Sequence, residues 1–154
     1  MLKLKEGDNA PPFEGISQNG SSHKLSDFSG KRLILFFYPK DMTPGCTAEA
    51  CNLRDHFDEL KTKGFELIGV SPDSALRHQK FTEKYDLPFP LIADEGKEIL
   101  TAYNVWAEKK MYGRSFMGVL RTTFIIDENG FILKIFPKVK TKDHTAQILT
   151  ALDM

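Results

Sequence analysis

The chain has 154 residues, of which 41% are hydrophobic and 27% are charged, as expected for a globular domain rather than a disordered or fibrous chain. Its 21 basic and 21 acidic side chains cancel, and no stretch collects five or six like charges, which argues against a nucleic-acid-binding surface. At this length a core forms without disulfide or metal, so we expect one domain over residues 1–154.

The longest apolar run, Leu33–Tyr38, is far shorter than the ~20 residues that a membrane-spanning helix requires. Residues 1–8 alternate apolar and charged side chains and lack the continuous apolar stretch of a secretory signal. We therefore expect a cytoplasmic protein that does not interact with a membrane. Persistent structural disulfides are rare in that compartment, so Cys46 and Cys51 are candidates for catalysis, redox sensing or metal binding.

The first predicted elements are a hairpin and a buried strand. Short runs at residues 14–16 and 22–25 flank the turn Gln18-Asn19-Gly20, which predicts a small N-terminal hairpin. Residues 32–38 then form a strand with apolar side chains on both faces, and Pro39 ends it. Such a strand is typical of a central position in a parallel or mixed sheet.

A helix is predicted to begin at Pro44 and to end at Gly64. Thr43 fits the N-cap and Pro44 the first helical position, which places Cys46 in the first turn. Apolar residues then recur at intervals of four, three, four and three on one face. They are Cys46, Ala50, Leu53, Phe57 and Leu60.

The rest of the chain predicts alternating strands and helices of one α/β domain. These elements are a strand at 65–70, a helix at 73–85, a short strand at 91–93, a helix at 95–103, strands at 122–126 and 131–136, and a helix at about 142–152. The turn Asp127-Glu128-Asn129-Gly130 predicts that the last two strands form a hairpin. Trp106 and the twelve phenylalanines are interpreted as core or edge residues, and Lys109-Lys110 as a solvated face.

Cys46 lies where the free amide N–H groups and the positive dipole end of a helix favour a thiolate over a thiol. The thiolate is the nucleophilic form of cysteine. The alternative is a buried cysteine that serves as a small hydrophobic residue of the apolar face. Position alone does not decide between these two interpretations.

The segment from residue 37 to residue 51 resembles the active-site signature of the peroxiredoxins. Pro39, Thr43 and Cys46 match its Pro-x-x-x-Thr-x-x-Cys core. Cys51, within Cys-Thr-x-Glu-Ala-Cys, resembles the bacterioferritin comigratory protein or peroxiredoxin Q subfamily. The signature is long, and therefore more specific than an isolated Cys-x-x-Cys.

Two later segments, Glu108–Gly113 and Arg121–Asp127, are similar to later parts of that subfamily, so the resemblance covers nearly the whole chain. It implies a thioredoxin-like α/β fold, which with the predicted elements gives a mixed central sheet flanked by helices and a short N-terminal hairpin. It also implies an antioxidant peroxidase that reduces hydrogen peroxide or organic hydroperoxides without metal, flavin or haem.

The resemblance assigns a role to each residue of the motif. Cys46 corresponds to the peroxidatic cysteine and Cys51 to the resolving cysteine, so a sulfenic acid would condense into an intramolecular disulfide. Thr43 corresponds to the hydroxyl that contacts the peroxide, Arg121 to the arginine that stabilises the thiolate, and Pro39 to the proline that shields the pocket. Thioredoxin, or a similar dithiol protein, is the implied reductant.

These residue types also make chemical sense together, because attack by a thiolate pushes negative charge onto the departing oxygen, and cationic and amide donors stabilise that charge. Taken alone, Arg121 would be interpreted as a surface arginine and Thr43 as a helix cap, a role that is compatible with substrate contact. Glu49 is assigned no chemistry, since it could equally be a solvated residue or a partner of the helix dipole.

Three other functions are possible for a chain with two cysteines. A zinc site is disfavoured because it needs four ligands at typical spacings, and the histidines are scattered at positions 23, 56, 78 and 144. A general disulfide oxidoreductase would usually carry Cys-x-x-Cys. A redox-switched binding module with the same disulfide remains an alternative. The chain has no third cysteine near its C-terminus, so we expect a monomer that resolves its sulfenic acid internally.

Overall fold

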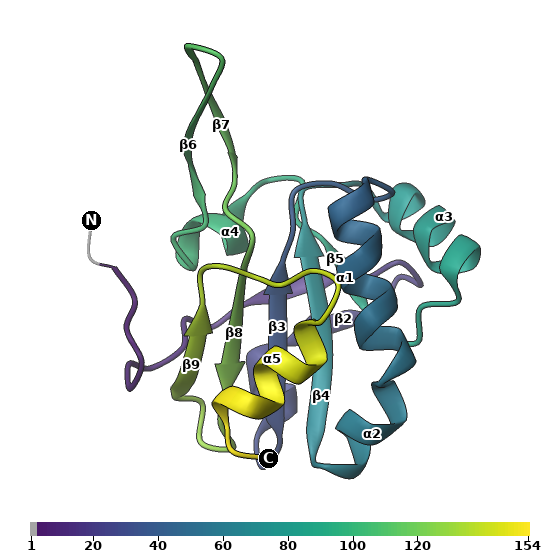
Figure 1. Ribbon diagram of the computed structural model, residues 1–154, viewed down its shortest axis with the longest axis vertical. Helices are drawn as coiled ribbons and strands as arrows, with labels where there is room; N and C mark the ends of the chain where they lie inside the picture. Colours follow the sequence, from purple (N-terminus) through teal and green to yellow (C-terminus); the bar gives the residue numbers. More distant parts are fainter. Residues whose placement is uncertain (1–2) are drawn as a thin grey trace.

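The computed structural model describes residues 3–154 and shows a five-stranded mixed sheet flanked by helices (Figure 1). The strand order is β5-β4-β3-β8-β9. The central strand β3 (Arg32–Phe37) pairs in parallel with β4 (Phe65–Ser71) and antiparallel with β8 (Thr122–Ile126). The outer strands are β5 (Leu91–Ala93) and β9 (Ile132–Phe136). The mixed α/β class is as predicted.

Strand β3 is buried on both faces because its alternate residues enter two cores. Leu33, Leu35 and Phe37 pack in the core that includes α4 (Glu98–Ala102) and the N-terminal segment. The intervening residues of β3 pack in the other core, with α1 (Pro44–Asp55), α3 (Ala75–Tyr85) and α5 (His144–Ala151). Their side chains are Ile34 and Phe36, followed by Tyr38 just after the strand.

The prediction of one helix from Pro44 to Gly64 is wrong in one respect, because the structure has two helices in this segment. Helix α1 ends at Asp55, and α2 (Phe57–Thr62) begins after His56. The His56 ring nitrogen Nδ1 lies 2.8 Å from the carbonyl oxygen of Asn52, which an uninterrupted helix would pair with the His56 backbone N–H. That N–H instead bonds to the carbonyl of Arg54. The side chain therefore competes for the helical hydrogen bond and interrupts the helix.

A hairpin that was not predicted from the sequence projects from the body of the molecule (Figure 1) and is made by β6 (Trp106–Met111) and β7 (Arg114–Val119). Tyr112 and Gly113 form its turn, both at positive φ, and the Tyr112 side chain is 97% exposed. The strands carry charged and exposed side chains along most of their length. They therefore lack the apolar pattern from which buried strands are recognised.

The other predicted elements are present, with shifted ends. The hairpin at the N-terminus consists of β1 (Glu14–Ile16) and β2 (Ser22–Lys24), and a 3₁₀ turn, η1 (Leu25–Phe28), follows it. Helix α4 is shorter than the predicted 95–103 because the Asp94 carboxylate accepts hydrogen bonds from the backbone N–H groups of Glu98 and Leu100. No helix within residues 3–154 is long and apolar enough to cross a membrane.

Candidate active site

Cys46 occupies the first turn of α1, as predicted, and its side chain is 2% exposed. The chain reaches this position from the carboxyl end of β3 through the loop at residues 38–43. In the antiparallel pair of β3 and β8, Phe37 lies opposite Thr122. This register brings Arg121, the residue before β8, to the end of β3 where the loop begins. The Arg121 Nη2 atom donates a hydrogen bond of 3.3 Å to the Cys46 Sγ atom.

The guanidinium of Arg121 is held in place by a second contact. Its Nη1 atom donates a hydrogen bond of 2.7 Å to the Oε1 atom of Glu49, one turn after Cys46 on α1. Glu49 is fully buried, and this burial raises the pKa of its carboxyl group to about 7 although Arg121 opposes the shift. One arginine therefore faces both the thiol and a buried carboxyl group.

His144, the first residue of α5, lies behind Glu49. Its Nε2 atom is 3.7 Å from the Oε2 atom of Glu49 and 2.8 Å from the Oγ1 atom of Thr123. Burial lowers the pKa of His144 to about 4, and the nearby Arg121 lowers it further while a hydrogen bond with Gln147 opposes the shift. The imidazole is therefore neutral at physiological pH.

Thr43 and Pro39 lie on the loop between β3 and α1. Thr43 has the extended backbone of an N-cap residue, but its hydroxyl donates a hydrogen bond of 2.7 Å to the carbonyl of Lys40 and does not cap the helix. The predicted cap is thus right for the backbone and wrong for the side chain. The first-turn amides of Gly45 and Cys46, which have no carbonyl partner within the helix, are left without this cap.

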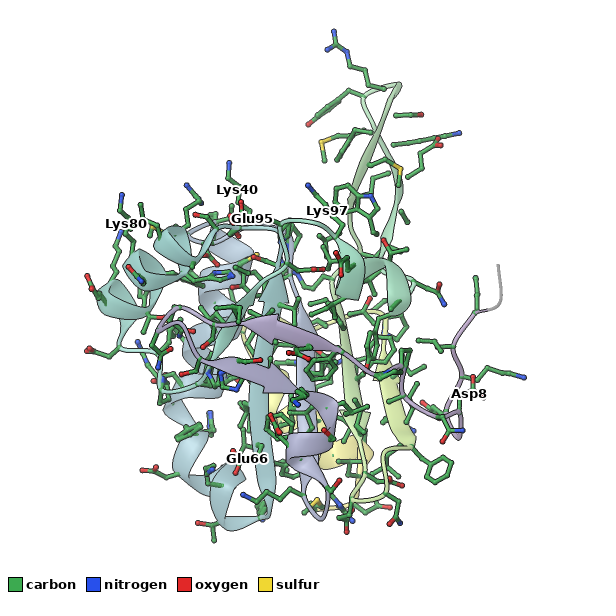
Figure 2. The ribbon with its side chains drawn as sticks, turned by 180° about the vertical axis from the view of Figure 1, so that it is seen from behind. Asp8, Lys40, Glu66, Lys80, Glu95 and Lys97 are labelled. Carbon is green, nitrogen blue, oxygen red and sulfur yellow. The ribbon has the colours of Figure 1, made fainter. Side chains whose placement is uncertain are left out.

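The loop is anchored to the interior through Asp41. This buried carboxylate accepts a hydrogen bond of 2.6 Å from the Tyr38 hydroxyl and lies 2.6 Å from the Nδ1 atom of His78 on α3. The backbone N–H of Asp41 donates to Asp73, which also accepts from Ser71. Lys40, the residue before Asp41, points outward at the same end of the molecule as Lys97 (Figure 2).

Among residues 3–154, Asp41, Asp73 and His78 form the one group whose potential ligand atoms would suit a metal ion, all within 4.8 Å of one another. The meeting of His78 with two carboxylates was not predicted from the sequence. Their oxygen and nitrogen atoms are already engaged in the hydrogen bonds that hold the loop. The group therefore fits a structural role better than a metal site.

Cys51 lies on the same helix as Cys46 but on another face. A spacing of five residues separates two positions by ~140° around a helix and ~7.5 Å along it. Cys51 is half-buried and, like Cys46, is a free thiol. Burial raises the pKa of the Cys51 thiol, an effect that the charge of Arg54 opposes and that of Asp55 reinforces. The structure thus brings Arg121 to Cys46, but it does not bring the two cysteines together.

Sequence reasoning missed two residues of this cluster, Glu49 and His144. A signal existed for Glu49, since it follows Cys46 by three residues and so shares its face of the helix. His144 had no such signal. Its position beside Glu49 depends on how α5 packs against α1, which local sequence does not reveal.

A reduced thiol at a helix N-terminus, facing an arginine on a mixed sheet flanked by helices, defines a thioredoxin-like enzyme that uses a thiol for redox chemistry. The family model of the AhpC/TSA family matches residues 7–135, and the chain belongs to this family.

Similarity to curated relatives indicates a subgroup within the AhpC/TSA family. Peroxiredoxin Bcp of Bacillus subtilis (strain 168) is 46% identical over 151 residues, which cover 98% of this chain and 96% of the relative. Peroxiredoxin Bcp of Escherichia coli (strain K12) is 42% identical over 152 residues, which cover 99% of this chain and 97% of the relative. This similarity makes the chain a peroxiredoxin of the Bcp group, a thiol peroxidase.

Solved structures of peroxiredoxin Q proteins have the same fold as this chain. A cysteine-to-serine variant of peroxiredoxin Q from Xylella fastidiosa superposes with a TM-score of 0.92 at 29% identity, covering 99% of this chain and 98% of that chain. Peroxiredoxin Q from Xanthomonas campestris superposes with a TM-score of 0.86 at 34% identity, covering 92% of this chain and 89% of that chain. The fold is therefore that of the peroxiredoxins, as the motif predicted.

Proposed function

We propose that Cys46 is the peroxidatic cysteine and that it reduces hydrogen peroxide and organic hydroperoxides. The observation that carries this assignment is the 3.3 Å hydrogen bond from Arg121 Nη2 to Cys46 Sγ at the N-terminus of α1. A nearby cation and free helix amides both favour the thiolate, which is the attacking form. The relative from Xanthomonas campestris has been studied for alkyl peroxide reduction, which supports the same substrate class here.

In the first step, the Cys46 thiolate attacks one peroxide oxygen. The sulfur–oxygen bond forms with the thiolate's electron pair, and the oxygen–oxygen bond breaks. The product oxygen leaves with that bond's electrons and takes up a proton, so the sulfur becomes a sulfenic acid and the peroxide becomes water or an alcohol. Arg121 and the amides of Gly45 and Cys46 stabilise the charge that develops on the departing oxygen.

Two loop residues complete the proposed pocket. The Thr43 hydroxyl donates to the carbonyl of Lys40, which leaves its oxygen free to accept a hydrogen bond from the peroxide O–H. Pro39 is half-buried at the start of the loop and would shield the pocket from water.

In the second step, the Cys51 thiol attacks the sulfenic acid, which releases water and forms the Cys46–Cys51 disulfide. A dithiol protein of the thioredoxin type then reduces this disulfide to two thiols and is itself oxidised to a disulfide. A cytoplasmic location would keep such a reductant available. The whole cycle is contained in one subunit, and we infer that the enzyme works as a monomer.

Single-turnover kinetics test the assignment of Cys46. We expect Cys46→Ser to abolish peroxide consumption, because a serine hydroxyl is not ionised at neutral pH. The wild-type protein should react with hydrogen peroxide orders of magnitude faster than a free cysteine does. A wild-type rate equal to that of free cysteine would favour a redox-switched binding module over a peroxidase.

The matched variant Cys51→Ser tests the resolving role. It should consume about one equivalent of peroxide and then stop, because its sulfenic acid has no internal partner. Mass spectrometry should detect this sulfenic acid on Cys46. Undiminished cycling with thioredoxin and its reductase would show that the sulfenic acid is resolved by another thiol.

A further inference from the structure

A chain of polar contacts leads from Cys46 into the interior. Arg121 bridges the Cys46 sulfur and the Oε1 atom of Glu49, at 3.3 and 2.7 Å. The other carboxyl oxygen of Glu49, Oε2, is buried, has no hydrogen-bond partner and faces the Nε2 atom of His144 at 3.7 Å. Glu49 and His144 are both fully buried. This orphan oxygen is unusual, because buried carboxyl oxygens normally have a partner.

The protonation of His144 follows from its neighbours. The Gln147 amide donates through Nε2 to the carbonyl of Lys138, and its Oε1 accepts from the backbone N–H of Lys140, which fixes Oε1 as an acceptor. Because the Nδ1 atom of His144 lies 2.9 Å from this Oε1, Nδ1 carries the ring proton. Nε2 of the neutral ring is therefore a lone pair, which accepts from the Thr123 hydroxyl.

A lone pair facing the Glu49 carboxyl has a direct consequence for the proton on that group. An ionised Oε2 would be a buried charge without a donor, which is costly. A protonated Oε2 can instead donate to the single lone pair of His144 Nε2, after a small approach from 3.7 Å and a rotation of the Thr123 hydroxyl away from that lone pair. Burial already raises the pKa of Glu49 to about 7, so the protonated form is accessible at physiological pH.

We propose that Glu49 and His144 form a proton-holding pair that positions Arg121. The charge of this pair changes with the oxidation state of Cys46. In the reduced enzyme Glu49 carries its proton on Oε2, toward His144. The positive charge of Arg121 then stabilises the Cys46 thiolate. When the sulfur becomes a neutral sulfenic acid, the positive charge of Arg121 acts on Glu49 alone and favours its carboxylate. Glu49 then loses one proton while the departing oxygen gains one, so the oxidation step needs no net proton from solvent.

The charges around the pair come from three elements. Cys46 shares α1 with Glu49, Arg121 precedes β8, and His144 begins α5. The strands β8 and β9 contribute the uncharged side chains of Thr123 and Phe136, whose ring packs edge-on against His144. Glu49 and His144 are thus positioning residues that act through Arg121. The inference rests on the proposed role of Cys46.

Infrared difference spectroscopy tests the proposal on Cys51→Ser, in which oxidation stops at the sulfenic acid of Cys46 and no disulfide unwinds α1. The spectrum of the peroxide-oxidised variant minus that of the reduced variant should show the loss of a protonated carboxyl band and the gain of a carboxylate band. Both should be absent when Glu49→Gln is combined with Cys51→Ser. An unchanged carboxyl region despite full oxidation of Cys46 would overturn the proposal and leave the role of Cys46 intact. Failure of Cys46 to oxidise at all would instead overturn the proposed function.

The pH profile of the rate constant for oxidation by hydrogen peroxide provides the second test. The wild-type profile should contain an inflection near the pKa of Glu49, about 7, with a slower reaction above it because ionised Glu49 competes with the thiolate for Arg121. Glu49→Gln should lack this inflection. A profile for Glu49→Gln that matches the wild type would overturn the proposal.

Substitutions of His144 distinguish positioning from simple packing. In His144→Ala the proton of Glu49 loses its acceptor and water can enter, so the inflection should move to lower pH. His144→Gln offers an amide oxygen as acceptor and should return the inflection toward the wild-type position. The control His23→Ala, in the N-terminal hairpin, should leave the profile unchanged. Identical profiles for wild type and a folded His144→Ala would contradict the role of His144.

Discussion

At the scale of the residue, Arg121 is the side chain on which the site depends. It is the cation that reaches the Cys46 sulfur, and it also satisfies the buried carboxyl of Glu49. We predict that Arg121→Ala slows the oxidation of Cys46 by roughly 10²–10³-fold, the usual cost of removing one donor from a site of developing negative charge. Stopped-flow kinetics with hydrogen peroxide measure this rate.

Arg121→Lys is the matched control for this prediction. Lysine keeps the charge but cannot donate to the thiolate and to Glu49 in the planar, two-pronged manner of a guanidinium. Its rate should lie between those of the wild type and Arg121→Ala. If Arg121→Ala oxidises as fast as the wild type, Arg121 has no part in the reaction, whatever its contact with Cys46.

At the scale of the element, α1 cannot remain intact through the proposed cycle. The two cysteines diverge around this helix, whereas a disulfide needs Cα atoms within ~4.4–6.8 Å and converging Cβ atoms. The helix is held by buried side chains such as Leu53 and by Asn52, which accepts from the Thr145 backbone N–H of α5. Exposing a leucine costs about 1.5–3 kcal/mol, so the disulfide forms against a folded-state preference for the helix.

We predict that oxidation converts roughly residues 45–53 to a loop. Amide hydrogen exchange should be faster in this segment of the oxidised protein than in the reduced protein, because unwinding breaks the helical hydrogen bonds. The disulfide should also be easier to reduce than a structural one, since strain raises its reduction potential. In Cys51→Ser, peroxide treatment should leave the exchange slow. Equal protection of this segment in both forms of the wild type would rule the unwinding out.

At the scale of the whole molecule, the chain contains two cysteines, and both lie on α1. The C-terminal helix α5 carries none that could reach the site of a neighbouring subunit. We predict that the oxidised protein migrates as a monomer on non-reducing denaturing gels. Cys51→Ser, treated in the same way, tests whether Cys46 can be captured by another chain. A dominant disulfide-linked dimer of the wild type would contradict the pairing of Cys46 with Cys51.

The sequence by itself determined the elements that build the sheet and placed Cys46 in the first turn of a helix. Its motif also pointed correctly to the peroxiredoxins. These features depend on local properties: apolar periodicity, the fixed φ of Pro44, and turn residues such as Gly130. The competition between the His56 side chain and the helix for the carbonyl of Asn52 was harder to foresee. The break between α1 and α2 at His56 was therefore not predicted.

Only the tertiary structure decided which distant residues meet at the sulfur. Arg121 reaches Cys46 because β3 and β8 pair in the register that sets Phe37 opposite Thr122, and a shift by one residue would turn the flanking side chains to the other face. His144 reaches Glu49 because α5 packs against α1. Register and helix packing depend on the summed burial of the whole core, and no local pattern in the sequence encodes them.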